Sequence, residues 1–163
     1  MDEKIVNREI RSAIKIGDIN KVKQLIGNDT KLIHTKTSFG TWLHTAAKKG
    51  NLDIVKFLVQ QGIDIDARGG TFDSSALNLA AGSGYLDIVK HLVKAGAELD
   101  VSLAKRNPLF GAIYGGHKNV VEFLVEKGID ISIRYTGENI KNMNAYEYAI
   151  EFGQTEIAEY LIR

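Results

Sequence analysis

The sequence predicts an all-α solenoid in which helix–turn–helix units stack side by side and are joined by short extended loops. Three observations predict it. Glycines recur at Gly17, Gly50, Gly84, Gly116 and Gly153, at intervals of 33, 34, 32 and 37 residues. A similar apolar pattern surrounds each of these glycines. The second helix of each unit is apolar on more than one face, as a helix packed between two neighbours requires.

In each unit the first helix is expected before the recurring glycine and the second helix after it. The segments before the glycines read IRSAIKI, LHTAAKK, LNLAAGS, LFGAIYG and YEYAIEF, and those after them read DINKVKQLI, NLDIVKFLV, YLDIVKHLV, HKNVVEFLV and QTEIAEYLI. Gly62, Gly96 and Gly128 close three of the second helices, and Asn28 and Asp29 mark the equivalent stop in the first unit. Glycine suits these ends because it adopts the left-handed conformation at low cost.

These units resemble ankyrin repeats. The family pattern, TPLHLAA followed by a variable pair, a glycine and a second helix, is similar to TWLHTAAKKGNLDIVKFLVQQGID, SALNLAAGSGYLDIVKHLVKAGAE and NPLFGAIYGGHKNVVEFLVEKGID, which begin at Thr41, Ser75 and Asn107. The resemblance implies one domain over residues 1–163, with repeats at roughly 4–35, 36–69, 70–101, 102–133 and 134–163. It also implies that the outer two repeats are degenerate caps, since each has one side in water.

Composition and charge narrow the classes of function. The chain has 21 basic and 20 acidic residues, so no overall field attracts nucleic acid or an anionic membrane. It has no cysteine, which excludes disulfides and thiolate metal sites. Neither a signal peptide nor a window of about 18 apolar residues is present. We therefore expect an intracellular, cytoplasmic and monomeric protein that binds neither nucleic acid nor a membrane.

The sequence offers no catalytic or cofactor motif. The four histidines form neither an H-x-x-x-H nor an H-E-x-x-H pair, and a P-loop, a G-x-G-x-x-G segment and a G-x-S-x-G elbow are all missing. We expect no enzyme activity and no cofactor. By the resemblance, Thr41 and His44 hydrogen-bond around the turn and hold the first helix in place. Asn78 occupies the position of His44 in the next unit.

Partner-binding residues are expected on one concave surface, formed by the exposed side of the first helices and by the extended loops, which we call fingers. This surface is predicted to be basic near the N-terminus, small in the middle and aromatic near the C-terminus. Aromatic residues and arginines are common interface anchors. The candidates are Phe39, Trp42, Lys48, Lys49, Arg68, Phe72, Gly82, Ser83, Arg106, Tyr114, Tyr135 and Phe152.

Some of these residues have an open alternative. Phe39 and Phe72 either face a partner or fold back onto neighbouring fingers, and the glycines in the middle either leave room for a partner or reflect sequence drift. Trp42 either packs under the adjacent finger or presents its ring to a partner.

The sequence thus predicts a protein–protein interaction scaffold that binds a partner protein through the concave groove and the finger loops. The alternative is an inhibitor or immunity-type protein that neutralises one enzyme or toxin. A small-molecule or nucleic-acid binder is a third class. The partner itself is not encoded in the fold.

Overall fold

A computed structural model describes residues 2–162, and most of its helices come in pairs. The pairs are α1 (Glu3–Ile16) with α2 (Ile19–Ile26), α4 (Trp42–Lys49) with α5 (Leu52–Gln60), α6 (Ala76–Ser83) with α7 (Leu86–Lys94), α8 (Pro108–Tyr114) with α9 (Lys118–Glu126), and α10 (Ala145–Glu151) with α11 (Thr155–Leu161). The predicted class, a mainly helical solenoid of paired helices, is confirmed.

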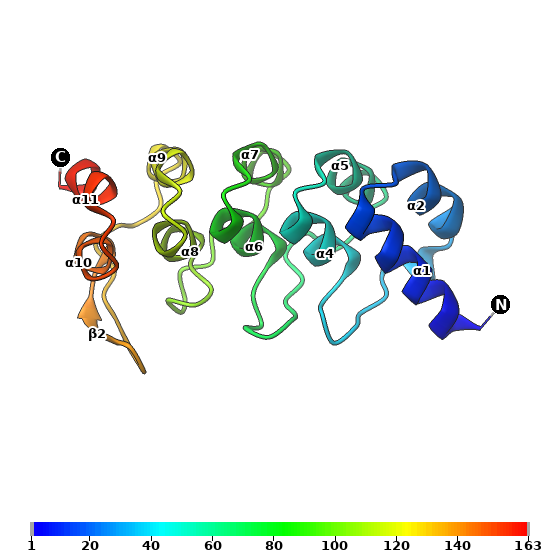
Figure 1. Cartoon of the computed structure of the whole chain (residues 1–163), viewed down its shortest axis with the longest axis horizontal. Helices are drawn as coiled ribbons and strands as arrows, with labels where there is room; N and C mark the ends of the chain where they lie inside the picture. Colours follow the sequence, from blue (N-terminus) through cyan, green and yellow to red (C-terminus); the bar gives the residue numbers. More distant parts are fainter. Residues whose placement is uncertain (1, 163) are drawn as a thin grey trace.

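The pairs stand in a row along the long axis of the molecule (Figure 1). The first helices α4, α6, α8 and α10 form one layer, and the second helices α5, α7, α9 and α11 form the other. The fingers project from the layer of first helices, and the two termini lie at opposite ends of the row. Residues about one repeat apart in the sequence are therefore neighbours in space.

Two elements were not expected. A short helix, α3 (Thr30–Ile33), follows the first pair, and the last finger contains an antiparallel hairpin of β1 (Tyr135–Gly137) and β2 (Ile140–Met143). Two of the other fingers carry only a single bridge each, Thr37 to Gly40 and Gly69 to Ser74. The hairpin forms where the connection is longest, because the extra residues give both strands room to pair.

Local capping explains where the helices begin and end. Asn107 accepts a hydrogen bond from the amide of Leu109 at 2.9 Å, and Pro108 occupies the first turn of α8, where its missing N–H costs nothing. Asn144 and Glu147 form a capping box at the start of α10. At the end of α4, Gly50 has φ 76°, which is the left-handed conformation predicted for the recurring glycines.

The core runs continuously between the two layers. Leu58, Leu92 and Leu124 occupy equivalent positions of α5, α7 and α9, and each has no exposed surface. Burying a leucine side chain contributes about 1.5–3 kcal/mol. The alanine pairs of α4 and α6 are also fully buried, which lets neighbouring first helices lie close together. The stack is therefore stabilised by contacts between repeats, and these contacts fix the fingers on one side of it.

Candidate partner-binding surface

His44 lies at the base of the finger that precedes α4 and holds two fingers in place. The Thr41 amide donates to His44 Nδ1 at 3.1 Å, so Nε2 carries the proton and donates to the Ser74 carbonyl at 2.8 Å. Burial is the main reason that the pKa of His44 lies below its usual value. Both ring nitrogens are occupied, so His44 has the structural role that the resemblance implied.

Asn78 performs the equivalent task one repeat later. Its Nδ2 donates to the Lys105 carbonyl at 2.7 Å, just as His44 reaches the carbonyl of Ser74 in the following finger. The two side chains differ in chemistry, but each donates a hydrogen bond to a backbone carbonyl of the next finger. This is expected of equivalent positions in a structural repeat. The hydrogen bonds of both residues thus link neighbouring fingers.

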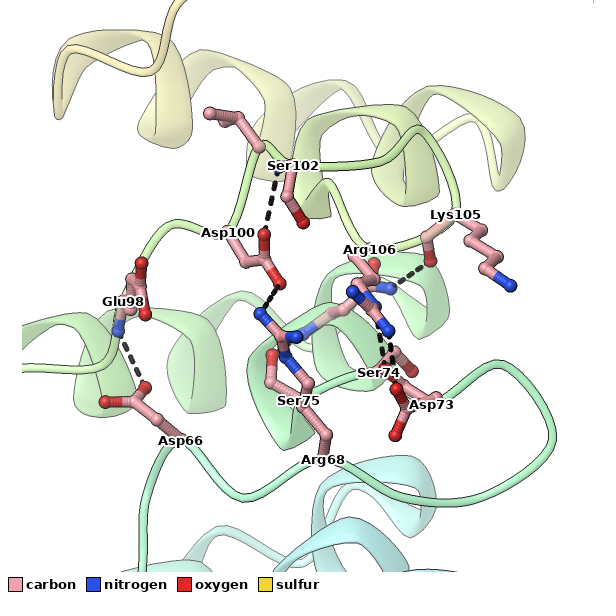
Figure 2. Close-up of polar contacts among 12 residues, drawn as sticks. Asp66, Arg68, Asp73, Ser74, Ser75, Glu98, Asp100, Ser102, Lys105 and Arg106 are labelled. Carbon is pink, nitrogen blue, oxygen red and sulfur yellow. Dashed lines mark hydrogen bonds and ion pairs between the residues drawn. The ribbon is translucent and has the colours of Figure 1, made fainter. Parts of the chain in front are cut away.

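The arginines Arg68 and Arg106 tie neighbouring fingers together. Figure 2 shows both side chains reaching toward carboxylates of the adjacent finger: Arg68 pairs with Asp100 at 2.8 Å, and Arg106 pairs with Asp73. Arg106 also donates to the Asp73 carbonyl at 3.0 Å. The guanidinium groups predicted as free anchors are thus engaged within the protein, because fingers one repeat apart bring opposite charges into reach.

The same region contains two further polar links. Asp66 accepts a hydrogen bond from the Glu98 amide at 2.8 Å (Figure 2). Partial burial alone would raise the pKa of Asp100, but hydrogen bonds from Ser102 and the charge of Arg68 hold it below its usual range. Asp100 therefore stays ionised at neutral pH, and the fingers form a connected layer.

Trp42 is not available to a partner, which corrects its inclusion among the candidate residues. Its side chain has no exposed surface, and Nε1 donates to the Leu32 carbonyl at 2.7 Å. The ring thus packs beneath the preceding connection, the first of the two alternatives. A large apolar ring with one polar atom is buried at low cost when that atom finds an acceptor.

The small residues in the middle of the surface serve helix packing, which corrects the expectation of an open space there. A Cβ added to Gly115 would lie 2.7 Å from the Gly82 carbonyl oxygen, and His117 Nε2 lies 3.1 Å from that same oxygen. A Cβ on Gly111 would lie 2.9 Å from Asn78 Oδ1. The glycines therefore let α6 and α8 approach closely. Ser83 is exposed beside them.

A row of aromatic rings runs through the C-terminal half of the stack. Successive rings pack with centroids 4.5–5.2 Å apart, in the order Tyr135, Phe110, Tyr148, Phe152 and Tyr114. Tyr114 ends the row and is 65% exposed. The aromatic character predicted for this half is present, but Phe110 and Tyr148 are buried, Tyr135 and Phe152 are half-buried, and Tyr114 alone of the five is exposed.

Tyr135 belongs to this row and has a structural role. Its hydroxyl donates to the Val101 carbonyl at 2.6 Å and accepts from Asn107 Nδ2 at 3.0 Å. Desolvation is the main cause that raises the pKa of Tyr135. Both capacities of the hydroxyl are used within the protein, so a partner would reach only part of this side chain.

A pocket of about 310 Å³ lies at the N-terminal end of the concave surface, between the first two fingers. Phe39 and Phe72 line it from successive fingers, and they are 62% and 58% exposed, so neither folds back onto its neighbours. Lys48 and Lys49 line it from the end of α4. The pocket thus brings together four of the predicted candidates.

Two further pocket residues, Arg11 and Lys15, were missed at the sequence level. They lie on α1, and the Arg11 guanidinium sits 4.4 Å from the centroid of the Phe39 ring, a cation–π arrangement. The repeat register could have found Lys15, since it occupies the position of Lys48 in the first unit. Arg11 aligns with His44, which pointed away from a surface role.

The charges around the pocket are all of one sign. Arg11, Lys15, Lys48 and Lys49 line it, and no aspartate or glutamate does. The salt bridges found within residues 2–162 leave all four of these cations unpaired. This is the concentration of basic charge predicted for the N-terminal half, and it faces an opening between two exposed aromatic rings.

A second, wider pocket of about 400 Å³ lies at the other end, beside the hairpin. It is lined by Arg134, which pairs with Glu147 at 2.6 Å, and by Lys141 and Glu151. Its charges are mixed and partly compensated, so it lacks the single sign of the first pocket.

Neither a metal site nor a membrane crossing was found in the part of the chain that the structure describes. Across residues 2–162, no three His, Cys, Asp or Glu side chains are grouped so that they could hold a metal ion. Over the same span, no helix has the length and apolar character needed to cross a membrane.

Comparison with known proteins agrees with the fold. A family model described as ankyrin repeats in three copies matches residues 10–103 and again residues 77–163. The palmitoyltransferase AKR1 of Naumovozyma castellii is 36% identical over 66 residues, which are 40% of this chain and 9% of that protein. The chain therefore corresponds to a small part of this relative, and the transferase activity in the printed name is that of the relative. The family match spans nearly the whole sequence, and the chain belongs to the ankyrin-repeat family.

Proposed function

We propose that this chain binds a partner protein through its concave surface, and that the pocket between the first two fingers is the main contact. Ankyrin repeats are typically protein–protein interaction modules. The observation that carries the proposal is the pocket itself, where Phe39 and Phe72 are exposed beside four unpaired cations. Exposed aromatic rings beside basic side chains are typical anchors of protein interfaces.

We also propose that all five helix pairs are ankyrin repeats, with the first and last pairs as caps. The buried residues of α1, which are Ile10, Ala13 and Ile14, lie three or four positions apart and thus on one face. In α6, by contrast, the buried residues include three consecutive positions, 76–78, and so occupy more than one face of the helix. A helix that meets a neighbour on one side only needs a single apolar face, so this difference supports a terminal role for α1.

The proposal assigns the chain no catalytic step. His44, the buried histidine nearest the pocket, uses both ring nitrogens to hold two fingers, which supports a binding role over a chemical one. The inhibitor or immunity-type role is the specific form that this binding would take if the partner is an enzyme or toxin. Adding the purified chain to such a partner would then lower the partner's activity.

The test is affinity purification from cells that contain the natural partner, followed by mass spectrometry. Three baits are compared: the natural chain, a pocket variant with Phe72→Ala, Lys48→Glu and Lys49→Glu, and a control variant with Lys56→Glu and Lys90→Glu. Both control lysines are exposed on the second helices, so the control makes the same change of charge away from the concave surface. Circular dichroism first confirms that all three are folded.

We expect the natural chain and the control to capture the same protein and the pocket variant to lose it. Capture of that protein by the pocket variant at the natural level would refute the pocket as the main contact. An equal loss of the partner from the control bait would refute the proposal that the concave surface is the binding site. It would show that charge anywhere on the molecule decides binding.

A further inference from the structure

We infer that this pocket receives an acidic peptide segment, with one large apolar side chain seated between Phe39 and Phe72 and carboxylates on either side of it. The inference rests on the proposed function and adds the chemistry of the partner. It follows from the charge of the pocket, its size and apolar walls, and the way its fingers are held.

The positive charge of the pocket favours a negatively charged ligand. Arg11, Lys15, Lys48 and Lys49 converge from two adjacent first helices and repel one another, with no carboxylate in the lining to compensate. The basic side chains of the neighbouring fingers, Arg68 and Arg106, are instead neutralised within the protein. Carboxylates of a bound segment would relieve the repulsion and gain attraction at a partly desolvated site.

The aromatic walls of the pocket also favour a ligand that carries an apolar side chain. Phe39 and Phe72 stand in successive fingers and expose more than half of their surface to solvent. The backbones of the two fingers touch beside the pocket: a Cβ on Gly69 would lie 2.6 Å from the Gly40 Cα, so the pocket that the two rings line is small. A volume of about 310 Å³ is at the lower end for ligand sites, enough for one large side chain and its backbone.

The fingers that carry these rings are fixed before anything binds. Gly69 and Ser74 exchange backbone hydrogen bonds at 3.2 Å, and His44 donates to the Ser74 carbonyl at 2.8 Å. The Asp73–Arg106 pair ties the same finger to the next one (Figure 2). A pocket whose walls are already ordered loses little conformational entropy on binding, which favours recognition of a short segment.

A peptide fits this surface better than a nucleic acid does. A nucleic-acid strand carries a charge at every phosphate and needs a basic track along its length. Beyond the pocket the first helices offer Gly82, Ser83, Tyr114 and Glu151 to the concave surface, and none of these four is a cation. Farther along the stack, Lys105 and Lys141 stand on separate fingers. The four cations of the first pocket converge on one place, which matches a local cluster of carboxylates.

The experiment selects ligands from a phage-displayed library of short random peptides on the natural chain. Enriched peptides are sequenced, and the binding of one labelled peptide is measured by fluorescence anisotropy. The variants are Lys48→Glu with Lys49→Glu, Phe72→Ala, Tyr114→Ala, and the control Lys56→Glu with Lys90→Glu. A copy of the peptide with its acidic residues changed to lysine and a labelled oligothymidylate serve as further probes.

We expect the enriched peptides to share aspartates or glutamates around one aromatic or large aliphatic residue. Their affinity should fall about tenfold or more with the Lys48 and Lys49 changes and with Phe72→Ala, and it should be unchanged in the control. Added salt should weaken binding to the natural chain. The lysine copy should prefer the Lys48→Glu, Lys49→Glu variant over the natural chain.

Enriched peptides without an acidic excess, or with unchanged affinity for the two pocket variants, would overturn the inference. Tighter binding of oligothymidylate than of the peptide would do the same and would assign the pocket to nucleic acid. Peptides that lose affinity only with Tyr114→Ala would overturn it and leave the proposed function standing, since the concave surface would still be the binding site. Failure of the partner capture described above would count against the proposed function.

Discussion

His44 shows how one residue can be interpreted by comparing it with its own copies. It lies buried at the base of a finger, and its counterpart Asn78 makes the same bond to the next finger with a different functional group. A catalytic site would need the imidazole chemistry, whereas a structural site needs only a donor at that place. His44, which at first resembles a reactive histidine, therefore serves to hold two fingers in place through its hydrogen bonds.

His44→Ala should lower the free energy of unfolding by about 1–2 kcal/mol, because the Thr41 amide loses its acceptor and the Ser74 carbonyl keeps only the bond from the Gly69 amide. His44→Asn should cost less, since an asparagine amide already makes the equivalent bond at Asn78. Urea unfolding followed by circular dichroism measures both. A cost for asparagine equal to that for alanine would show that the ring itself is required.

The same residue predicts a dependence of stability on pH. Because burial lowers the pKa of His44 in the folded state, the unfolded state binds the proton more readily. The stability advantage of the natural chain over His44→Asn should be complete above the ordinary value of about 6.5 and shrink as the pH falls below it. The slope cannot exceed about 1.4 kcal/mol per pH unit, the limit for one proton.

Unfolding of both proteins at about pH 7.5 and about pH 5.5 tests this. His91, whose pKa is also lowered mainly by desolvation, is present in both and cancels in the difference. An advantage that stays constant over this range would show that His44 titrates alike in the folded and unfolded chains.

Among the elements, the first helices α6 and α8 owe their spacing to glycine. Gly115 ends α8 with a helical φ of −74°, so the backbone itself would accept any residue there. The restriction comes from the neighbouring helix, whose Gly82 carbonyl leaves no space for a Cβ. The contact between α6 and α8 thus explains why position 115 is a glycine, although the backbone conformation there would allow any residue.

Gly115→Ala should destabilise the protein by about 1–3 kcal/mol, because its Cβ would press against the Gly82 carbonyl and His117. Gly82→Ala should do the opposite. The nearest atoms to its Cβ lie 3.8 Å away, so the better helix propensity of alanine should stabilise α6 by about 0.5–1 kcal/mol. Thermal unfolding of the two variants measures the contrast, and the same sign of effect in both would contradict the packing explanation.

At the scale of the whole molecule, the stack has unlike ends. Unpaired basic residues gather around the first pocket, and the exposed Tyr114 lies in the C-terminal half. The net charge of the chain, +1, does not reveal that unpaired basic residues are concentrated at one pocket. Each repeat contacts mainly its neighbours. A destabilising substitution in the middle of the stack should therefore affect repeats on both sides, whereas one at the end should affect a single neighbour.

Leu92→Ala removes a fully buried side chain from α7 in the middle of the stack and should cost about 2–5 kcal/mol. It should lower amide hydrogen-exchange protection in the repeats on both sides. The matched change Leu161→Ala lies in α11 at the end and should reduce protection mainly in α10 and α11. If both variants reduced protection equally along the whole chain, the stack would behave as one cooperative unit.

The sequence by itself determined the helix pairs, the family and the structural role of His44, because tandem copies reveal which positions serve the fold. It also placed Phe39, Lys48, Lys49 and Phe72 on one surface, and the structure brings these four residues together around one pocket. Only the tertiary structure decided that Trp42 is buried, that Arg68 and Arg106 pair with neighbouring fingers, and that Arg11 and Lys15 complete the pocket. The physical reason is distance: these outcomes depend on side chains about one repeat apart in sequence, which become neighbours only when the repeats stack.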